Sequence, residues 1–530
     1  MVVSGTGGLS KTGAGTLTLS ATNTYTGGTA IEAGTLVLTG ALNSATDVSL
    51  TGTSVWDLRA TQTVASLSMA SGSSITRGAG TSALTVTGLS TLARSITTSG
   101  TQTYHGAVTL AAETSLTGST INTQSTLAGG GNALTITGAA DIDGAFSGIT
   151  NLSVSGTANI GANVTTTGTQ TYAGAVTLSG GDRTLTASTV NTQSTLAGGG
   201  NALTITGAAD IDGALSGITN LSVSGTANIG ANVTTTGTQT YGDAVTLSGG
   251  DRTLSGSIIN TQSTLAGGGN ALTITGAADI DGAFTGITNL SVSGTANIGA
   301  NVTTTGMQTY AGAVTLSGGD RTLIGSTINT QSTLDGGGNA LTITGAADVD
   351  GAFTGLTALS ISGDSNLGAN VTTTGTQTYG GAVTLSGGDR TLTASTVNTQ
   401  STLAGGGNAL TITGAADVNG AFTGLTALSI SGDSNLGANV TTTGAQTYAG
   451  AVTLSGGDRT LTGTSINTQS TLAGGGNALT ITGATNIDGA FTGLTNLSVS
   501  GTSNIGANVT TSGSQTYTGA VTLSGGDRTL

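Results

Sequence analysis

One hexapeptide, Asn-Thr-Gln-Ser-Thr-Leu, recurs through most of the chain at a fixed interval of 69 residues. Its six copies begin at Asn122, Asn191, Asn260, Asn329, Asn398 and Asn467. A sequence that repeats at this scale forms one structural unit per copy, and each unit buries its apolar face against its neighbours. The repeat therefore favours a solenoid over a set of separate globular domains.

Each copy contains short segments in which apolar and polar residues alternate. Residues 175–180 (AVTLSG), 202–207 (ALTITG) and 220–225 (NLSVSG) show this pattern. Alternation with a period of two is typical of half-buried β-strands. Helix is disfavoured because Thr, Val and Ile lose rotamer freedom in a helix, and because Gly recurs every few residues.

The apolar anchors of these segments give a length for one turn of the solenoid. Val176, Leu203, Leu221 and Val245 are separated by 27, 18 and 24 residues, which average 23. We predict an all-β, right-handed parallel β-helix (a β-solenoid) with roughly 23 residues per coil and three coils in each 69-residue repeat. Gly, Asn and Asp fit its corners, since they adopt positive φ at low cost.

The 69-residue repeats do not extend over the whole chain. We predict tandem repeats over residues 99–530, of which the last copy is truncated. Residues 41–98 are expected to form irregular solenoid coils, and residues 1–40 carry a different motif.

The composition leaves few side chains able to carry out chemistry. The 530 residues include 93 Gly but no Pro, no Cys, one His and only 6% charged residues. The chain therefore has no disulfide or thiol chemistry. The net charge of −14 includes no basic stripe, so we expect no nucleic acid partner. No apolar run approaches the roughly 18 residues of a membrane helix, so we expect no membrane span in this chain.

Three stretches resemble repeats of bacterial surface proteins. Residues 7–20 (GGLSKTGAGTLTLS), 23–29 (NTYTGGT) and 33–36 (AGTL) resemble the autotransporter-associated passenger repeat, which we assign to residues 1–40. Residues 55–67 (VWDLRATQTVASL) are similar to the segment that follows this repeat in autotransporter passengers, although Arg59 replaces the usual small or amide residue. From about residue 99, the motif Gly-Thr-Gln-Thr-Tyr-x-Gly-Ala-Val-Thr-Leu resembles repeats of filamentous-haemagglutinin-like surface proteins.

The resemblance implies export by a type V secretion route, with a β-helical passenger displayed on, or released from, the outer membrane of a Gram-negative bacterium. The expected location is thus the cell surface or the extracellular space. No signal peptide precedes residue 7, and no amphipathic barrel segment follows Leu530. The outer-membrane translocator is therefore expected to come from a further part of the protein or from a separate chain.

A repeated Asp-x-Asp motif is the candidate metal site, because alternate carboxylates are able to share a hard cation such as Ca²⁺. The candidate ligands are Asp141, Asp143, Asp210, Asp212, Asp279, Asp281, Asp348 and Asp350. Later copies read Asp417-Val-Asn419 and Asn486-Ile-Asp488, as expected if Asp and Asn serve equally as turn formers. This second interpretation is favoured, so we predict no bound metal and no cofactor.

A series of tyrosines is the candidate glycan-binding row. Aromatic faces stack on sugar rings, and one tyrosine recurs every 69 residues. The candidates are Tyr172, Tyr241, Tyr310, Tyr379, Tyr448 and Tyr517. The alternative interpretation is that each ring covers a corner of its coil.

No catalytic residue is predicted, because identical carboxylates in every copy lack the unique constellation that glycoside hydrolysis needs. We predict a surface-displayed β-solenoid passenger or stalk of an adhesin-like protein, which presents a long rigid binding surface and is not an enzyme. Two alternatives stay open, a passive structural filament or spacer and a polysaccharide-active β-helix enzyme. Expected partners are glycans or matrix proteins of a host or neighbouring cell, and a second copy of the chain in end-to-end self-association.

Overall fold

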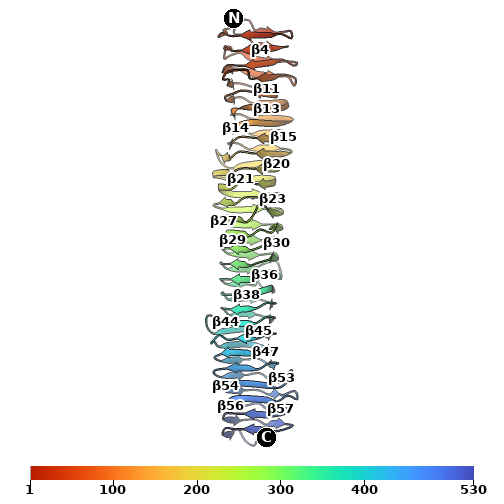
Figure 1. Ribbon diagram of the computed structural model, residues 1–530, viewed down its shortest axis with the longest axis vertical. Coiled ribbons are helices and arrows are strands. Elements are labelled where there is room, and N and C mark those ends of the chain that lie inside the picture. The colour runs from red at the N-terminus through yellow and green to blue at the C-terminus, as the bar shows by residue number, and fades with distance from the viewer. Residues whose placement is uncertain (1) are drawn as a thin grey trace. The chain divides into compact units, whose positions relative to one another are not determined.

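The computed structural model describes residues 2–530, and in this range it contains short β-strands and turns but no helix. The chain forms two compact units, residues 1–265 (unit 1) and 266–530 (unit 2), which are described separately. Within each unit, parallel strands stack as successive rungs (Figure 1).

Unit 1 begins with irregular coils and continues into the repeats. The irregular coils contain β1 (Leu9–Lys11), β2 (Thr16–Leu19), β3 (Thr29–Ile31), β4 (Thr35–Leu38), β5 (Asp47–Leu50), β6 (Val55–Leu58), β7 (Gln62–Val64), β8 (Ser66–Met69), β9 (Ser74–Thr76), β10 (Leu84–Val86) and β11 (Ser90–Thr97), and the repeats begin with β12 (Gln102–Tyr104). The repeats contain β13 (Val108–Thr123), β14 (Leu127–Ile142), β15 (Phe146–Val154), β16 (Ala158–Ile160), β17 (Val164–Thr166), β18 (Thr169–Tyr172), β19 (Val176–Leu178), β20 (Arg183–Thr192), β21 (Leu196–Ile211), β22 (Leu215–Val223), β23 (Ala227–Ile229), β24 (Val233–Thr235), β25 (Thr238–Tyr241), β26 (Val245–Leu247) and β27 (Arg252–Thr261).

Unit 2 consists of repeats throughout. Its strands are β29 (Leu272–Ile280), β30 (Phe284–Ile287), β31 (Leu290–Val292), β32 (Ala296–Ile298), β33 (Val302–Thr304), β34 (Gln308–Tyr310), β35 (Val314–Leu316), β36 (Arg321–Thr330), β37 (Leu334–Asp335), β38 (Leu341–Val349), β39 (Phe353–Leu356), β40 (Leu359–Ile361), β41 (Ser365–Leu367), β42 (Val371–Thr373), β43 (Thr376–Tyr379), β44 (Val383–Leu385), β45 (Arg390–Thr399), β46 (Leu403–Ala404), β47 (Leu410–Val418), β48 (Phe422–Leu425), β49 (Leu428–Ile430), β50 (Ser434–Leu436), β51 (Val440–Thr442), β52 (Gln446–Tyr448), β53 (Val452–Leu454), β54 (Arg459–Thr468), β55 (Leu472–Ala473), β56 (Leu479–Ile487), β57 (Phe491–Leu494), β58 (Leu497–Val499), β59 (Ser503–Ile505), β60 (Val509–Thr511), β61 (Gln515–Tyr517) and β62 (Val521–Leu523).

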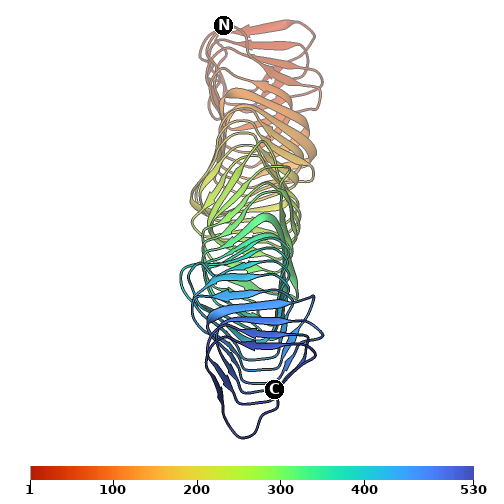
Figure 2. The ribbon, with the colours of Figure 1, turned by 60° about the horizontal axis from the view of Figure 1, so that its bottom comes forward.

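One coil of the solenoid contains three strands. In unit 2, β30, β31 and β32 form such a coil, and β33 then pairs in parallel with β30, so that Val302 lies opposite Phe284. Alternate side chains point inward, as in β31, where Leu290 and Val292 are buried and Ser291 is exposed. Figure 2 shows the backbone of the coils closing on itself, and the buried side chains lie inside. The predicted all-β parallel solenoid is confirmed, whereas its right-handedness stays a prediction.

The coils contain roughly 19–23 residues, in line with the predicted length of roughly 23, and the coils of the repeats are the shorter ones. Residues that pair between neighbouring coils are 21 apart for Val164 and Leu185, 20 apart for Leu185 and Ile205, and 18 apart for Ile205 and Val223. The sequence average exceeds the spacing within the repeats because its anchors belong to different sides of the coil. Val176 pairs with Leu196 and not with the next anchor, Leu203.

The strand columns of unit 2 show how the repeat is wound. Column A contains β30, column B contains β31 and column C contains β32, which are the three strands of one coil. Pairing along column A leads from Phe284 to Phe491 in eleven coil-to-coil steps. These residues are 207 positions apart, which is three repeats. One 69-residue repeat therefore makes three and two-thirds turns.

Equivalent residues of successive repeats consequently lie on different sides of the solenoid. Phe284 lies in column A, Phe353 in column C and Phe422 in column B. The predicted three coils per repeat are therefore two-thirds of a turn too few. The physical reason is the number of strand segments in one repeat. A repeat has nine strands, β33–β41. Because β36 and β38 each turn a corner and contribute to two columns, these nine strands supply eleven segments. Eleven segments do not divide evenly among three sides.

Close contact between coils explains part of the high glycine content. Gly207 has a φ of 120°, and a Cβ atom at this position would overlap the carbonyl oxygen of Ala187 in the preceding coil. Only glycine accepts both constraints without strain.

The register makes a direct prediction for cross-linking. Ser360 and Thr378 pair across neighbouring coils of column A, and neither side chain is buried. Because the chain has no Cys, the double substitution Ser360→Cys and Thr378→Cys introduces two unique thiols. We expect them to form a disulfide under mild oxidation, since Cα atoms about 4.4–6.8 Å apart are within bridging range. Thiol titration and peptide mass mapping measure the result.

The matched control pairs Ser360→Cys with Thr384→Cys, because Thr384 is exposed but lies in column B. This pair should stay reduced. Cross-linking of the control pair in preference to the first pair would contradict the 18-residue register.

Candidate functional site

The repeated tyrosines lie inside the coils. Five of them have no exposed surface: Tyr172, Tyr241, Tyr310, Tyr379 and Tyr448. Tyr517, in β61 of the last described coil, is partly exposed. A ring enclosed by its own coil cannot stack on a sugar, so the predicted glycan-binding row is wrong. The row is also broken by the winding, because Tyr310, Tyr379 and Tyr448 lie in columns B, A and C.

Each buried tyrosine is part of an internal hydrogen-bonded clip. The Tyr310 hydroxyl donates to Gln308 Oε1 at 2.9 Å. Gln308 Nε2 donates to the carbonyl oxygen of Val302 in its own coil at 3.1 Å and to that of Ile324 in the next coil at 2.8 Å. The clip therefore satisfies buried polar groups and joins two coils. This glutamine was not among the predicted site residues, although Gln stands two residues before each repeated Tyr and alternate residues share one face of a strand.

Burial raises the pKa of these phenols above the ordinary value of tyrosine. The folded chain therefore keeps its phenolic protons at a pH where the unfolded chain loses them, so folding stability falls as the pH rises above about 10. We expect little tyrosinate absorbance from the folded chain at about pH 11, followed by a steep rise on alkaline unfolding. The same chain in guanidinium should titrate near pH 10. Ionisation of most phenols near pH 10 while the circular dichroism is unchanged would show that the rings are accessible.

The Asp-x-Asp motifs place one carboxylate in a side-chain ladder that runs from coil to coil. Asp210 Oδ2 accepts a hydrogen bond from Asn191 at 3.2 Å, and Asp210 Oδ1 accepts one from Asn228 at 2.7 Å. These asparagines lie on the preceding and the following coil. Asp141 and Asp348 occupy the same rung in their repeats, with Asn122 and Asn159 and with Asn329 and Asn366 as partners. Each such aspartate therefore links three coils.

Where asparagine replaces aspartate in this ladder, the contact with the following coil is kept, while the asparagine amide donates to Asp488 of its own motif. In the last full copy, Asn486 Oδ1 accepts a hydrogen bond from Asn504 at 2.7 Å. The second aspartate of the motif lies outside the ladder in the first copy, where the pKa of Asp143 is raised by partial burial and, less strongly, by Asp141. Among residues 2–530, no group of three or more His, Cys, Asp or Glu side chains is arranged to hold a metal ion. The absence of a bound metal stays a prediction, Ca²⁺ binding stays its less favoured alternative, and the ladder is the role that the contacts of these aspartates support.

The ladder predicts different outcomes for two substitutions of one residue. Asp210→Asn keeps an acceptor for Asn228, and its amide is able to donate to Asn191 Oδ1, a buried atom without a partner. Asp210→Ala leaves both neighbouring amides unpaired, which we expect to cost about 1–3 kcal/mol. Because a solenoid opens locally, the measurement is hydrogen exchange of the backbone amides in β20–β23. Equal protection in the two variants would exclude a structural role for this rung.

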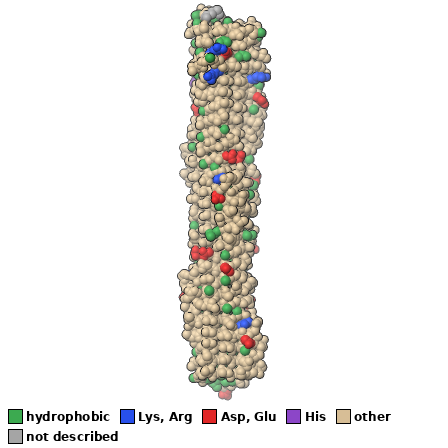
Figure 3. All heavy atoms as spheres, in the orientation of Figure 1, with side chains coloured by type: hydrophobic (Ala, Val, Ile, Leu, Met, Phe, Trp, Pro, Cys, Tyr) green, Lys and Arg blue, Asp and Glu red, His purple; other side chains and the backbone are tan. Residues whose placement is uncertain are grey.

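The repeated Asp-Arg pairs also connect coils. Arg321 Nε donates to the carbonyl oxygen of Ser317 at 2.8 Å and holds the Gly318-Gly319 corner. Asp320 Oδ1 accepts a hydrogen bond from the backbone N–H of Ala340 in the next coil at 2.8 Å. Charged side chains elsewhere are scattered over the visible face without a continuous acidic or basic patch (Figure 3). No helix long and apolar enough to cross a bilayer occurs among the described residues.

A family model described as passenger-associated-transport-repeat matches residues 9–43. Residues 9–43 are thus similar to a passenger-associated transport repeat. In the structure this repeat forms β1–β4, where the buried Lys11 ammonium donates to the carbonyl oxygens of Gly13 at 2.7 Å and Ala33 at 2.8 Å. The transport repeat and the β-solenoid together fit an autotransporter passenger repeat protein, as the sequence resemblance implied. This family implies a secreted or surface location.

The comparison with curated proteins gives no match, and neither does the comparison with solved structures.

Proposed function

We propose that the chain is a stalk in the passenger of a type V-secreted protein, which holds another part of that protein away from the outer membrane of a Gram-negative cell. The observation that carries this proposal is that the repeated polar side chains make contacts between coils. The Gln-Tyr clip, the Asn-Asp-Asn ladder and the Asp-Arg corner each connect one coil to the next. A repeat whose polar residues are used in this way adds stiffness with every copy.

The spacer is thus the best supported of the three functions that the sequence left open. An adhesin that binds glycans through a row of tyrosines would need exposed rings, whereas five of the six repeated tyrosines are buried. The repeated carboxylates, which an enzyme would need in a unique pair, accept hydrogen bonds from the amides of neighbouring coils. We also propose the expected partners of such a passenger. They are glycans or matrix proteins, an outer-membrane translocator, and a second copy of the chain in end-to-end self-association.

The winding gives a way to test the stalk. Deletion of residues 285–491 joins Phe284 to Thr492 and removes three repeats, so the chain continues in the same column and register. We expect a folded chain that is shorter by eleven turns, or about 50 Å at about 4.8 Å per turn. With the chain fused to a surface-display translocator, the height of an N-terminal fluorophore above the membrane measures the change.

The matched control deletes residues 285–484, which is seven residues fewer and joins Phe284 to Thr485 out of register. This variant should be cleaved at the junction by a protease that leaves the first variant intact. An unchanged fluorophore height in the in-register deletion would argue against a stalk.

A further inference from the structure

The first repeat differs from the others where it meets the irregular coils. Later copies read Ser-Gly-Gly-Asp-Arg-Thr-Leu at one corner, as at residues 179–185, whereas the first copy reads Ala-Ala-Glu-Thr-Ser-Leu at residues 111–116. As a result, β13 runs without interruption through this point, where the later copy has two separate strands, β19 and β20. Glu113, one of only two glutamates in the chain, is exposed at this position.

A shallow, open groove of about 850 Å³ lies over this junction in unit 1. Four hydroxyl-bearing residues on successive coils line it: Ser74, Ser95, Ser115 and Thr135. Their order follows from the register, in which Ser95 pairs with Ser115 and Ser115 with Thr135. Ser74 adjoins Ser95, because Ile75 pairs with Ile96. The hydroxyls therefore form a regular column along the groove.

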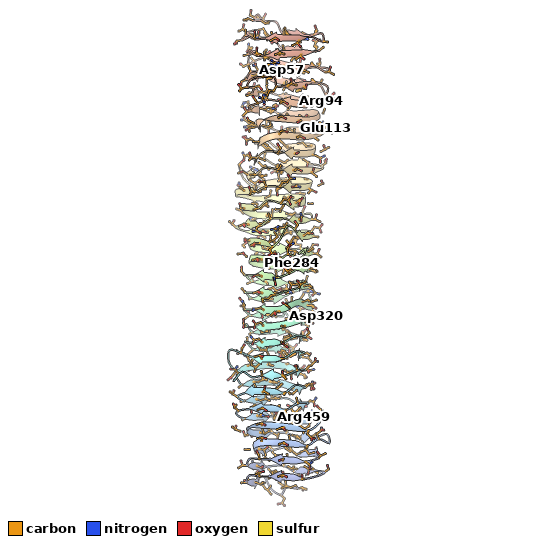
Figure 4. The ribbon with its side chains drawn as sticks, viewed as in Figure 1. Asp57, Arg94, Glu113, Phe284, Asp320 and Arg459 are labelled. Atoms are coloured by element: carbon orange, nitrogen blue, oxygen red, sulfur yellow. The ribbon has the colours of Figure 1, made fainter. Side chains whose placement is uncertain are left out.

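Arg94 and Glu113 line the same groove. Figure 4 labels them on the same side of the structure. Arg94 has a φ of 52° and is the one non-glycine residue among residues 2–530 with a positive φ. Its Nε donates to the carbonyl oxygen of Ser71 at 2.7 Å, which orients an otherwise exposed guanidinium group. Backbone strain of this kind persists where the surroundings impose it, and it is concentrated at binding sites.

We propose that this groove binds a neutral oligosaccharide, a function beyond that of the stalk. Sugar hydroxyls both donate and accept hydrogen bonds, and the groove offers both kinds of partner. Arg94 donates, Glu113 accepts, and the column of Ser and Thr hydroxyls does either. An anionic ligand is disfavoured because Glu113 lies in the same groove and the chain carries a net charge of −14. No aromatic residue lines the groove, so the affinity rests on hydrogen bonds, and we expect a dissociation constant of about 1 mM.

The test uses the full chain and tetrasaccharides of glucose, mannose, galactose and N-acetylglucosamine, with tetragalacturonate as the anionic comparison. Saturation-transfer NMR and calorimetry measure binding. We expect saturable binding of at least one neutral tetrasaccharide and weaker binding of tetragalacturonate. The absence of neutral binding at about ten times the expected dissociation constant, or a preference for tetragalacturonate, would overturn the proposal.

Three substitutions locate the site. Arg94→Gly removes the guanidinium and relieves the positive φ, so the variant should fold at least as well as the parent chain. Glu113→Gln and Thr135→Val keep the shape of the side chain and change its hydrogen bonding. Each should weaken binding by about tenfold. The matched control is Arg77→Ala, since Arg77 is exposed in unit 1 but does not line the groove.

Parental affinity in all three groove variants would also overturn the proposal. Because Glu113→Gln and Thr135→Val leave the strained residue intact, they keep the test valid if Arg94→Gly does not fold. The stalk function depends on the repeats and would stand in every one of these outcomes.

Discussion

The coils of this protein are stable only against one another, because the backbone hydrogen bonds of a parallel solenoid run between coils. Leu290 N–H donates to the carbonyl oxygen of Met307, and Ala296 N–H to that of Ala313, each at 2.9 Å and each in the following coil. Register is therefore fixed at every step, since a slip by one residue would turn the apolar side chains outward. Side-chain contacts such as Gln308 with Ile324 and Asp320 with Ala340 also join one coil to the next and reinforce that register.

The Asn-Asp-Asn ladder shows how stacking governs which polar residues the repeat tolerates. Strands about 4.8 Å apart bring outward side chains of neighbouring coils into contact. A carboxylate above another carboxylate would be repelled, whereas Asp210 is flanked by the amides of Asn191 and Asn228. The exchange of Asp for Asn at position 486 keeps an oxygen acceptor for Asn504. Aspartate and asparagine thus both serve here as acceptors for the amide of the following coil, in addition to their use in turns.

The sequence predicted the class of fold but not its winding, and the difference has a physical basis. Alternation in segments such as residues 202–207 reports the two faces of a strand, which is sufficient to predict a stacked β structure. Coil length depends on where the chain turns a corner. A strand such as β36 turns a corner while it stays paired with β38, and only a register shift after Ile324 marks the turn. The tyrosines were misplaced for a related reason. Gln308 and Tyr310 occupy alternate positions on the inward face of their strand. From the sequence alone, two polar side chains on one face are expected to face solvent. Only the structure shows that the Gln308 amide has buried carbonyl partners.

The mismatch between the 69-residue repeat and the three-sided coil determines what this sequence is able to display. Each added repeat extends the stack by three and two-thirds turns, about 18 Å, and moves equivalent residues to another side. A surface feature encoded once per repeat is therefore distributed over all three sides, and it returns to the same side only after 207 residues, as Phe284 and Phe491 do. A continuous binding row along one side would require a repeat with a whole number of turns. Recognition at a single place instead requires residues that occur once, and Arg94 and Glu113 meet this condition because they lie where the repeat pattern is broken.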